Sequence, residues 1–175
     1  GAEDLVTMSS GPTSTQYRPR TEGLFADIQH LRDAANDFWR VRTKDGLSSF
    51  YGTPKAAGND PAAIANPERR ADVFAWKLTR TEDTFGNRIE YGYARDATRS
   101  DGPHRWDQLY LDEIRYLDYG DIANPSFLVT VRFHYAPRPD SFSEYRAGFE
   151  IRTVQRCTRI EIATHAGQER LSRSY

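Results

Sequence analysis

One stretch of the sequence alternates apolar and polar side chains more strictly than any other, and this limits the possible folds. The apolar set is Phe127, Val129, Val131, Phe133 and Tyr135, and the residues between them include Thr130, Arg132 and His134. A period of two places the sets on opposite faces of a β-strand, because successive strand side chains point to opposite sides. The run therefore predicts a sheet strand with one apolar face.

Turn signals predict that neighbouring strands are joined by tight hairpins. Glycine and asparagine supply the positive φ angles that two-residue hairpin turns require. The expected turns, each between extended aromatic or β-branched segments, are Asp45-Gly46, Gly86-Asn87 and Ala166-Gly167. Convincing helical periodicity is rare. The predicted fold class is all-β, with antiparallel hairpins forming a curved sheet or a sandwich-like module and little helix.

Other segments lack this regularity, and less sheet is expected in them. Residues 52–72, rich in proline, glycine and alanine, are predicted to form a long connection without sheet, and residues 96–107 a loop. The segment Pro137 to Asp140 should end its strand, because proline cannot donate to a ladder. In 109–119 the apolar residues change parity near Asp112-Glu113, which either a β-bulge or an amphipathic helical turn would explain.

Charge and length exclude several classes of function. The 175 residues fit one ordinary domain, and 24 basic against 25 acidic side chains give a net charge of -1. This balance offers no basic patch for the nucleic-acid backbone, so we expect no nucleic-acid partner. No stretch approaches the roughly 20 apolar residues that cross a bilayer, and no secretory signal is visible near Gly1, so we expect a soluble chain without a membrane span.

The residue types that carry catalysis or metal binding are not arranged for either. Four histidines lie far apart without metal-ligand spacing, and we interpret them as solvated or hydrogen-bonded; they are His30, His104, His134 and His165. The single cysteine, Cys157, is expected to be a small core residue. Glu150 and Glu161 could imitate the carboxylate pair of a glycosidase, although cross-strand pairing with arginines explains them more simply. We predict no catalytic, cofactor-binding or metal-binding residues, no cofactor and no enzymatic activity.

Aromatic residues suggest the main alternative, a free-standing carbohydrate- or protein-binding β-sandwich. Rings on a flat sheet face can stack on sugars, whereas rings beneath a second layer form core, which is the more common case. The candidate residues are Trp39, Tyr91, Tyr93 and Trp106.

Several blocks of the sequence resemble the SpvB-type region of plasmid virulence proteins and of the B component of insecticidal toxin complexes. The blocks occur in the same order and cover nearly the whole chain after residue 16. They include Tyr17 to Phe25, Phe38 to Gly46, Phe50-Tyr51-Gly52, Ala65-Asn66-Pro67, Trp76-Lys77-Leu78, Asp83 to Tyr93, Tyr110 to Tyr116, and the strongest block, Arg138 to Thr153 followed by Arg156-Cys157.

The resemblance implies a structural part of a larger secreted protein. Such regions contribute strands to an Rhs/YD-repeat shell that carries or encloses a toxic C-terminal payload, while the ADP-ribosyltransferase activity of the family belongs to a separate domain. It implies an extracellular location, and as partners the remainder of the same shell and other toxin-complex subunits. No catalytic residue is carried over to this chain.

The same interpretation gives the expected domain organisation. Residues 1–16, which mix serine, threonine, glycine and proline, are expected to be a flexible N-terminal lead-in, and residues 17–175 a single SpvB-like β domain excised from a larger protein. Removing neighbouring strands should leave unpaired sheet edges, through which the chain could oligomerise.

Overall fold

The chain folds into one large antiparallel sheet with two small ladders beside it. The computed structural model describes residues 3–21, 23 and 25–175, and these contain no helix. In spatial order the large sheet contains β1 (Leu5–Ser10), β2 (Ser14–Pro19), β3 (Asp27–Arg32), β4 (Asp37–Arg42), β5 (Ser48–Tyr51), β8 (Leu78–Glu82), β9 (Arg88–Arg95), β12 (Leu109–Gly120), β13 (Pro125–Glu144), β14 (Ile151–Ala166) and β15 (Gln168–Ser174). The all-β prediction is confirmed.

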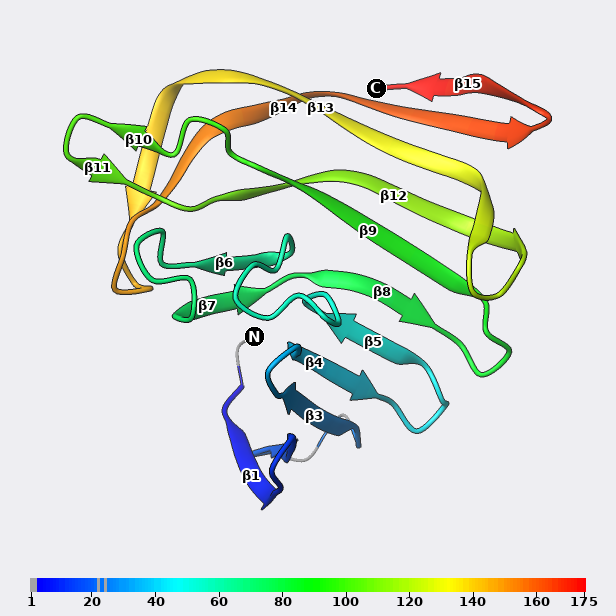
Figure 1. Ribbon diagram of the computed structural model, residues 1–175. Coiled ribbons are helices and arrows are strands. Elements are labelled where there is room, and N and C mark those ends of the chain that lie inside the picture. Colours follow the sequence, from blue (N-terminus) through cyan, green and yellow to red (C-terminus); the bar gives the residue numbers. More distant parts are fainter. Residues whose placement is uncertain (1–2, 22, 24) are drawn as a thin grey trace.

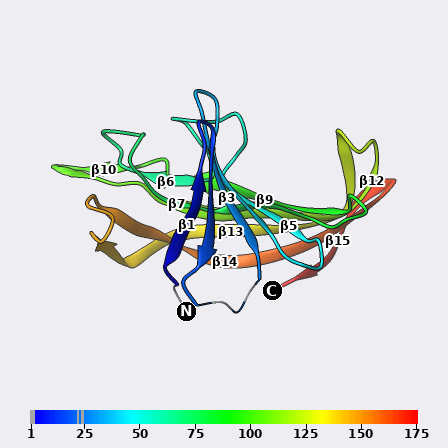
Figure 2. The same ribbon diagram turned by 90° about the horizontal axis from the view of Figure 1, so that it is seen from below.

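The order of the strands in space follows their order in the chain. Each described strand of the large sheet pairs with the next one, apart from two places where a short ladder is inserted. The first insertion holds β6 (Ala63–Ala65) and β7 (Val73–Trp76), and the second holds β10 (Ser100–Asp101) and β11 (His104–Arg105). Figure 1 shows the resulting curved sheet, and Figure 2 shows the long strands β9 and β12–β14 as a shallow arc with β6 and β10 on one side.

The predicted hairpins form where the turn residues indicated them. Gly46 adopts φ 90° between β4 and β5, and Gly86 adopts φ 88° between β8 and β9. In the second turn Asp83 accepts hydrogen bonds from the backbone N–H groups of Phe85 and Asn87, which fixes the loop conformation. A β-bulge lies between Leu111 and Glu113 where β12 pairs with β9, so the change of parity is explained by a bulge and not by a helical turn.

Four expectations about local structure were wrong. Residues 5–10 and 14–16 of the expected lead-in form strands, because their serines and threonines pair in a ladder that β3 extends. The connection 52–72 contains β6, since its alanines are almost fully buried. Short ladder β10–β11 lies within the expected loop 96–107. Strand β13 continues through Pro137, which is opposite Gln155, and through Pro139, which lies in a register shift where residues 138–141 have no ladder partners.

The buried core is small and lies at one end of the sheet. Its centre consists of Ile64, Leu109 and Ile151, against which the half-buried Tyr93 and Phe149 pack. This places the core between the inserted ladder β6–β7 and the large sheet. The rest of the large sheet is close to a single layer, which matches the predicted curved sheet better than a sandwich.

The accessible surface gives a measure of this sparse packing. The chain exposes 11047 Å², whereas a folded monomer of 20.1 kDa is expected to expose about 8,700 Å². The excess exceeds the roughly 800 Å² per partner that a standard protein–protein interface removes. The fold therefore offers enough surface for extensive contact with other protein segments.

Candidate functional site

The outer strands of the large sheet are open for further pairing. Strand β1 pairs only with β2, and β15 pairs only with β14, among residues 3–21, 23 and 25–175. All side chains of both strands are exposed. Figure 1 shows β1 and β15 at opposite ends of the sheet. An outer strand carries a row of unpaired N–H and C=O groups and can accept another strand, as expected from the sequence.

Strand β15 is nevertheless held firmly to the sheet. Glu169 accepts two hydrogen bonds from the guanidinium of Arg132 on β13, at 2.7 and 3.0 Å. These bonds lower the pKa of Glu169. The backbone groups of Ile160 and Tyr175 also exchange two hydrogen bonds. The open side of β15 is therefore presented in a defined, extended conformation.

Three turns meet beside an apolar hollow, and we call this region the apolar rim. The rim consists of Leu47, residues 81–83 and 87–89, residues 116–118 and Leu128, and the hollow that they line has a volume of about 590 Å³. Apolar side chains in its lining are Leu47, Ile89, Leu117 and Leu128. Leu117 has φ 57° and is 57% exposed, an unfavourable conformation for a leucine. Exposed apolar groups gathered in this way are typical of an interaction surface.

Arg88 joins two of the turns that form the rim. Its backbone N–H donates to Asp118 at 2.9 Å, and its guanidinium donates to the carbonyl of Ile122. The shape of the rim is therefore fixed by polar contacts beneath the exposed apolar side chains.

A buried ionic cluster at the other end attaches the inserted ladder β6–β7 to the large sheet. Asp107, which is 1% exposed, accepts hydrogen bonds from Arg95, from Arg70 at 2.7 Å, and from the backbone N–H of Ala65 at 2.9 Å. Arg95 also donates to the carbonyl of Ala63 at 2.8 Å. Burial alone would raise the pKa of Asp107, but the bonds from Arg95, Ala65 and Arg70 outweigh it and lower that pKa. We interpret the cluster as structural.

A second buried carboxylate in the same region is that of Glu150, which is 5% exposed. Ser143 donates to one of its oxygens at 2.6 Å, and His104 Nδ1 lies 3.0 Å from the other. Burial would raise the pKa of Glu150, yet the bonds from Ser143 and His104 lower it. The carboxylate stands between the hydroxyl and the imidazole, so the serine is not activated as it would be in a Ser–His–acid triad.

Glu150 and Glu161 do not form a glycosidase pair. They are separated by roughly 35 Å of extended chain, because β14 pairs with β13 along this length apart from two register shifts. Glu161 lies 2.7 Å from His134 and does not share partners with Glu150. Hydrolysis by two such carboxyl groups requires a separation of roughly 5 to 10 Å.

The expectation that Cys157 lies in a core was wrong. Its side chain is exposed, on a part of β14 where four consecutive residues, 156–159, are all exposed. Consecutive exposure on both faces of a strand occurs because no second layer covers the sheet there.

The candidate sugar-binding aromatics are dispersed and largely engaged. Trp106 is 1% exposed and donates through Nε1 to buried Asp96 at 2.7 Å, so its ring offers no face to a ligand. Trp39 stacks on His30 with ring centroids 4.3 Å apart. The hydroxyl of Tyr93 donates to the carbonyl of Leu78, and burial raises the pKa of Tyr93 to about 12. Tyr91 and Tyr93 both line a hollow of about 330 Å³, away from Trp39 and Trp106.

Each histidine lies beside a carboxylate, which was not visible in the sequence. The pairs, with their shortest nitrogen–oxygen distances, are His30–Asp37 at 2.7 Å, His104–Glu150 at 3.0 Å, His134–Glu161 at 2.7 Å and His165–Glu169 at 3.7 Å. Within the described part of the chain, no group of three or more histidine, cysteine or acidic residues is placed to hold a metal ion. The same residues include no helix that could span a membrane.

Comparison with known proteins identifies the family. Residues 4–116 and 110–165 match the family described as SpvB, Salmonella virulence plasmid 65kDa B protein. The chain belongs to the SpvB family. A curated SpvB relative, the mono(ADP-ribosyl)transferase SpvB of Salmonella typhimurium, is 24% identical over 94% of this chain. The chain spans only 33% of that relative's length.

Solved structures of SpvB and of toxin-complex proteins share the fold. The N-terminal domain of effector protein SpvB from Salmonella typhimurium strain LT2 has a TM-score of 0.76 at 20% identity, covering 96% of this chain and 67% of that one. A TcdB2-TccC3-Cdc42 structure gives 0.75 at 21% identity, covering 99% of this chain and 11% of that one. The Photorhabdus luminescens Tc holotoxin pore gives 0.76 at 21% identity, covering 99% and 10%. These likenesses show that the chain shares the fold of these proteins.

Proposed function

We propose that this chain is a non-catalytic structural module of a secreted SpvB-like or toxin-complex protein. In this proposal it contributes strands to a β-shell, with Rhs/YD-repeat segments as neighbours, that carries or encloses a toxic C-terminal payload. Its partners are the remainder of its own shell and other toxin-complex subunits, and its location is extracellular.

The main support is the combination of a nearly single-layered sheet with two open outer strands. A sheet of eleven strands that exposes about 2,300 Å² more than a typical monomer can be covered or extended by other segments. Strand β15 offers an edge to a further strand, and the apolar rim offers a surface for another layer. The likeness to much longer toxin-complex chains, of which it covers only 11% and 10%, supports the same role.

Hydrogen exchange tests the proposal by comparing this chain alone with the larger shell protein that the proposal requires. In the isolated chain, amides on the open sides of β1 and β15 should exchange rapidly, and in the larger protein at least one of these strands should become strongly protected. The central pair β12–β13 serves as an internal control, since its amides are paired in both forms. Equal exchange of both outer strands in the two proteins would contradict the proposal.

We also propose the domain division expected from the sequence, with residues 17–175 as a single SpvB-like β domain and residues 1–16 as a lead-in that pairs with the sheet through β1 and the start of β2. Deleting residues 1–16 should leave the thermal unfolding transition of the remaining sheet in place. Loss of cooperative unfolding in the shortened chain would show that β1 and the first half of β2 are required for the domain.

A further inference from the structure

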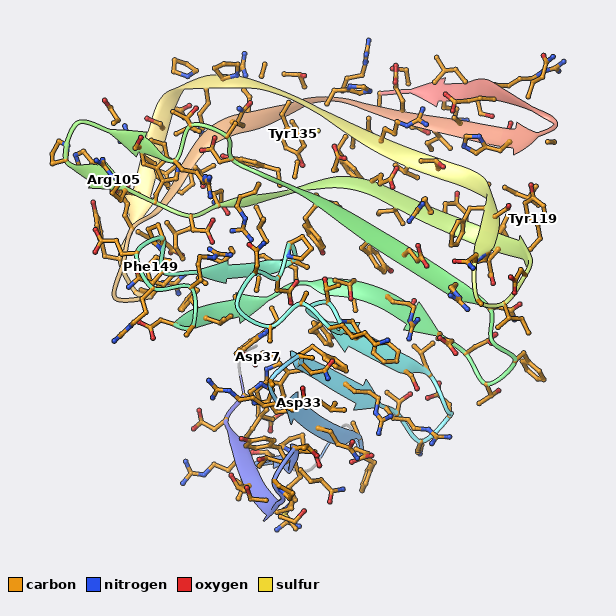
Figure 3. All side chains as sticks on the ribbon, viewed as in Figure 1. Asp33, Asp37, Arg105, Tyr119, Tyr135 and Phe149 are labelled. Carbon is orange, nitrogen blue, oxygen red and sulfur yellow. The ribbon has the colours of Figure 1, made fainter. Side chains whose placement is uncertain are left out.

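A polar hollow lies at the opposite end of the sheet from the apolar rim, and the proposed function does not use it. Three segments that are distant in sequence form it: residues 66–68, 103–105 and 145–150. Its volume is about 460 Å³, within the range of small-molecule sites. Figure 3 shows Arg105 and Phe149, both in its lining, at one end of the molecule and Tyr119 at the other.

The position of Glu150 in this hollow is fixed by several contacts. Its side chain is 5% exposed, and its backbone carbonyl accepts a hydrogen bond from the N–H of Asp107 at 3.2 Å. Ser143 occupies one carboxylate oxygen, and His104 lies against the other. The carboxylate is therefore a fixed anchor for the imidazole ring.

This anchor determines which nitrogen of His104 is free to accept a hydrogen bond. An ionised carboxylate can only accept, so Nδ1 of His104 must donate to Glu150. In the neutral ring Nε2 then carries a lone pair. Nε2 has no hydrogen-bond partner among the residues that the structure describes, and the ring is 47% exposed. The hollow thus contains an oriented acceptor available to a ligand.

The remaining lining favours a neutral ligand that donates hydrogen bonds and has an apolar face. Glu68 and Glu150 outnumber the single cation, Arg105, whose guanidinium already donates to the carbonyls of Gly102 and His104. This balance disfavours anions. Flat apolar surfaces in the lining come from Pro67, Pro103, Tyr145 and Phe149. A sugar ring combines hydroxyl donors with an apolar face that packs on aromatic rings.

We propose that this hollow binds a neutral sugar ring, with Nε2 of His104 accepting a hydrogen bond from a sugar hydroxyl and Tyr145 packing against the ring face. The site differs from the aromatic candidates of the sequence, and Trp106 beside it is enclosed. Because the hollow is remote from the open strands, sugar binding does not depend on the proposed shell role. Either proposal can fail without the other.

The test separates ligand binding from the structural role of the His104–Glu150 contact. Replacement His104→Asn keeps a side-chain N–H near the position of Nδ1 and removes Nε2, so the anchor to Glu150 is retained. His134→Gln is the matched control, because His134 contacts Glu161 through Nε2 and a glutamine amide keeps an N–H near that position. Tyr145→Ala removes an exposed ring and is a second variant that does not depend on Glu150.

Binding is measured by saturation-transfer NMR and titration with free glucose, galactose, mannose and N-acetylglucosamine, and with sialic acid as an anionic comparison. We expect saturable binding of at least one neutral sugar, weakened about tenfold by His104→Asn or Tyr145→Ala, unchanged by His134→Gln, with thermal unfolding unaltered. The proposal is overturned if no neutral sugar saturates, if sialic acid alone binds, or if both hollow variants bind as the unmodified chain does. Should His104→Asn fail to fold, the Tyr145→Ala result decides.

Discussion

Replacing Asp107 with asparagine tests whether the buried ionic cluster attaches the inserted ladder β6–β7 to the large sheet. The substitution keeps the size of the side chain but removes the charge that faces Arg95 and Arg70. Breaking a buried ion pair on one side costs about 3–5 kcal/mol, because the remaining charge is left without a partner. Both arginines are partly exposed, at 19% and 26%, so water can solvate them and we expect about 3 kcal/mol.

A loss of this size is large for such a sheet. Domains are stable by only about 5–15 kcal/mol, and a chain of this length loses roughly 2–4 °C of Tm for each kcal/mol. Urea unfolding followed by tryptophan fluorescence should therefore show a clearly lower midpoint concentration for Asp107→Asn. Thermal unfolding should give a Tm roughly 6–12 °C lower. Asp140→Asn is the control, since Asp140 pairs with Arg138 on the exposed surface, and it should change little.

The pH dependence of this effect has a defined sign. The pKa of Asp107 is lowered in the folded chain, so its contribution is complete above the unfolded pKa of about 3.9 and is lost as pH falls through the lower folded value. The difference between the unmodified chain and Asp107→Asn should be constant near neutral pH and decrease below about pH 4. Equal stability of the Asp107→Asn and Asp140→Asn variants at pH 7 would refute the reasoning.

Three further predictions concern single side chains. Trp106→Phe removes the buried bond to Asp96 and should cost about 1–3 kcal/mol in urea unfolding, and a neutral result would show that Asp96 finds another donor. Leu117→Gly relieves the positive φ and should stabilise the chain by up to about 1 kcal/mol, whereas a loss of similar size would show that the leucine packs productively. Tyr93→Phe should remove one late-ionising group from an ultraviolet titration, because burial raises the pKa of Tyr93 to about 12; an unchanged high-pH phase would contradict this.

The sequence predicted the parts of the fold that depend on local pattern. The period-two run over 127–135 and the turns at Gly46 and Gly86 lie where expected, because side-chain alternation and positive φ are properties of short segments. Strand β6 was missed because three residues are too few to show a period-two pattern. Their place in the fold is set by distant contacts, such as the hydrogen bond from the N–H of Ala65 to Asp107, 42 positions farther along the chain. The prediction that the segment Pro137 to Asp140 ends a strand was wrong, because the strand continues past a register shift in which residues 138–141 have no ladder partners.

The candidate sites depended on contacts that no local pattern encodes. His104 and Glu150 are 46 residues apart, and Arg70 and Asp107 are 37 apart, so their spacing carries no recognisable signal. The exposure of Cys157 was also hidden, because alternation indicates that one face is apolar but not whether another layer covers it.

The sequential arrangement of the strands has a consequence for how the chain acquires its structure. Each newly formed strand can dock on the one that preceded it, so assembly can advance along the polypeptide without waiting for distant segments to arrive. Growth of this kind suits a protein that emerges gradually from a ribosome. It also lets evolution lengthen or shorten the ribbon by whole hairpins, because no connection needs to be rethreaded.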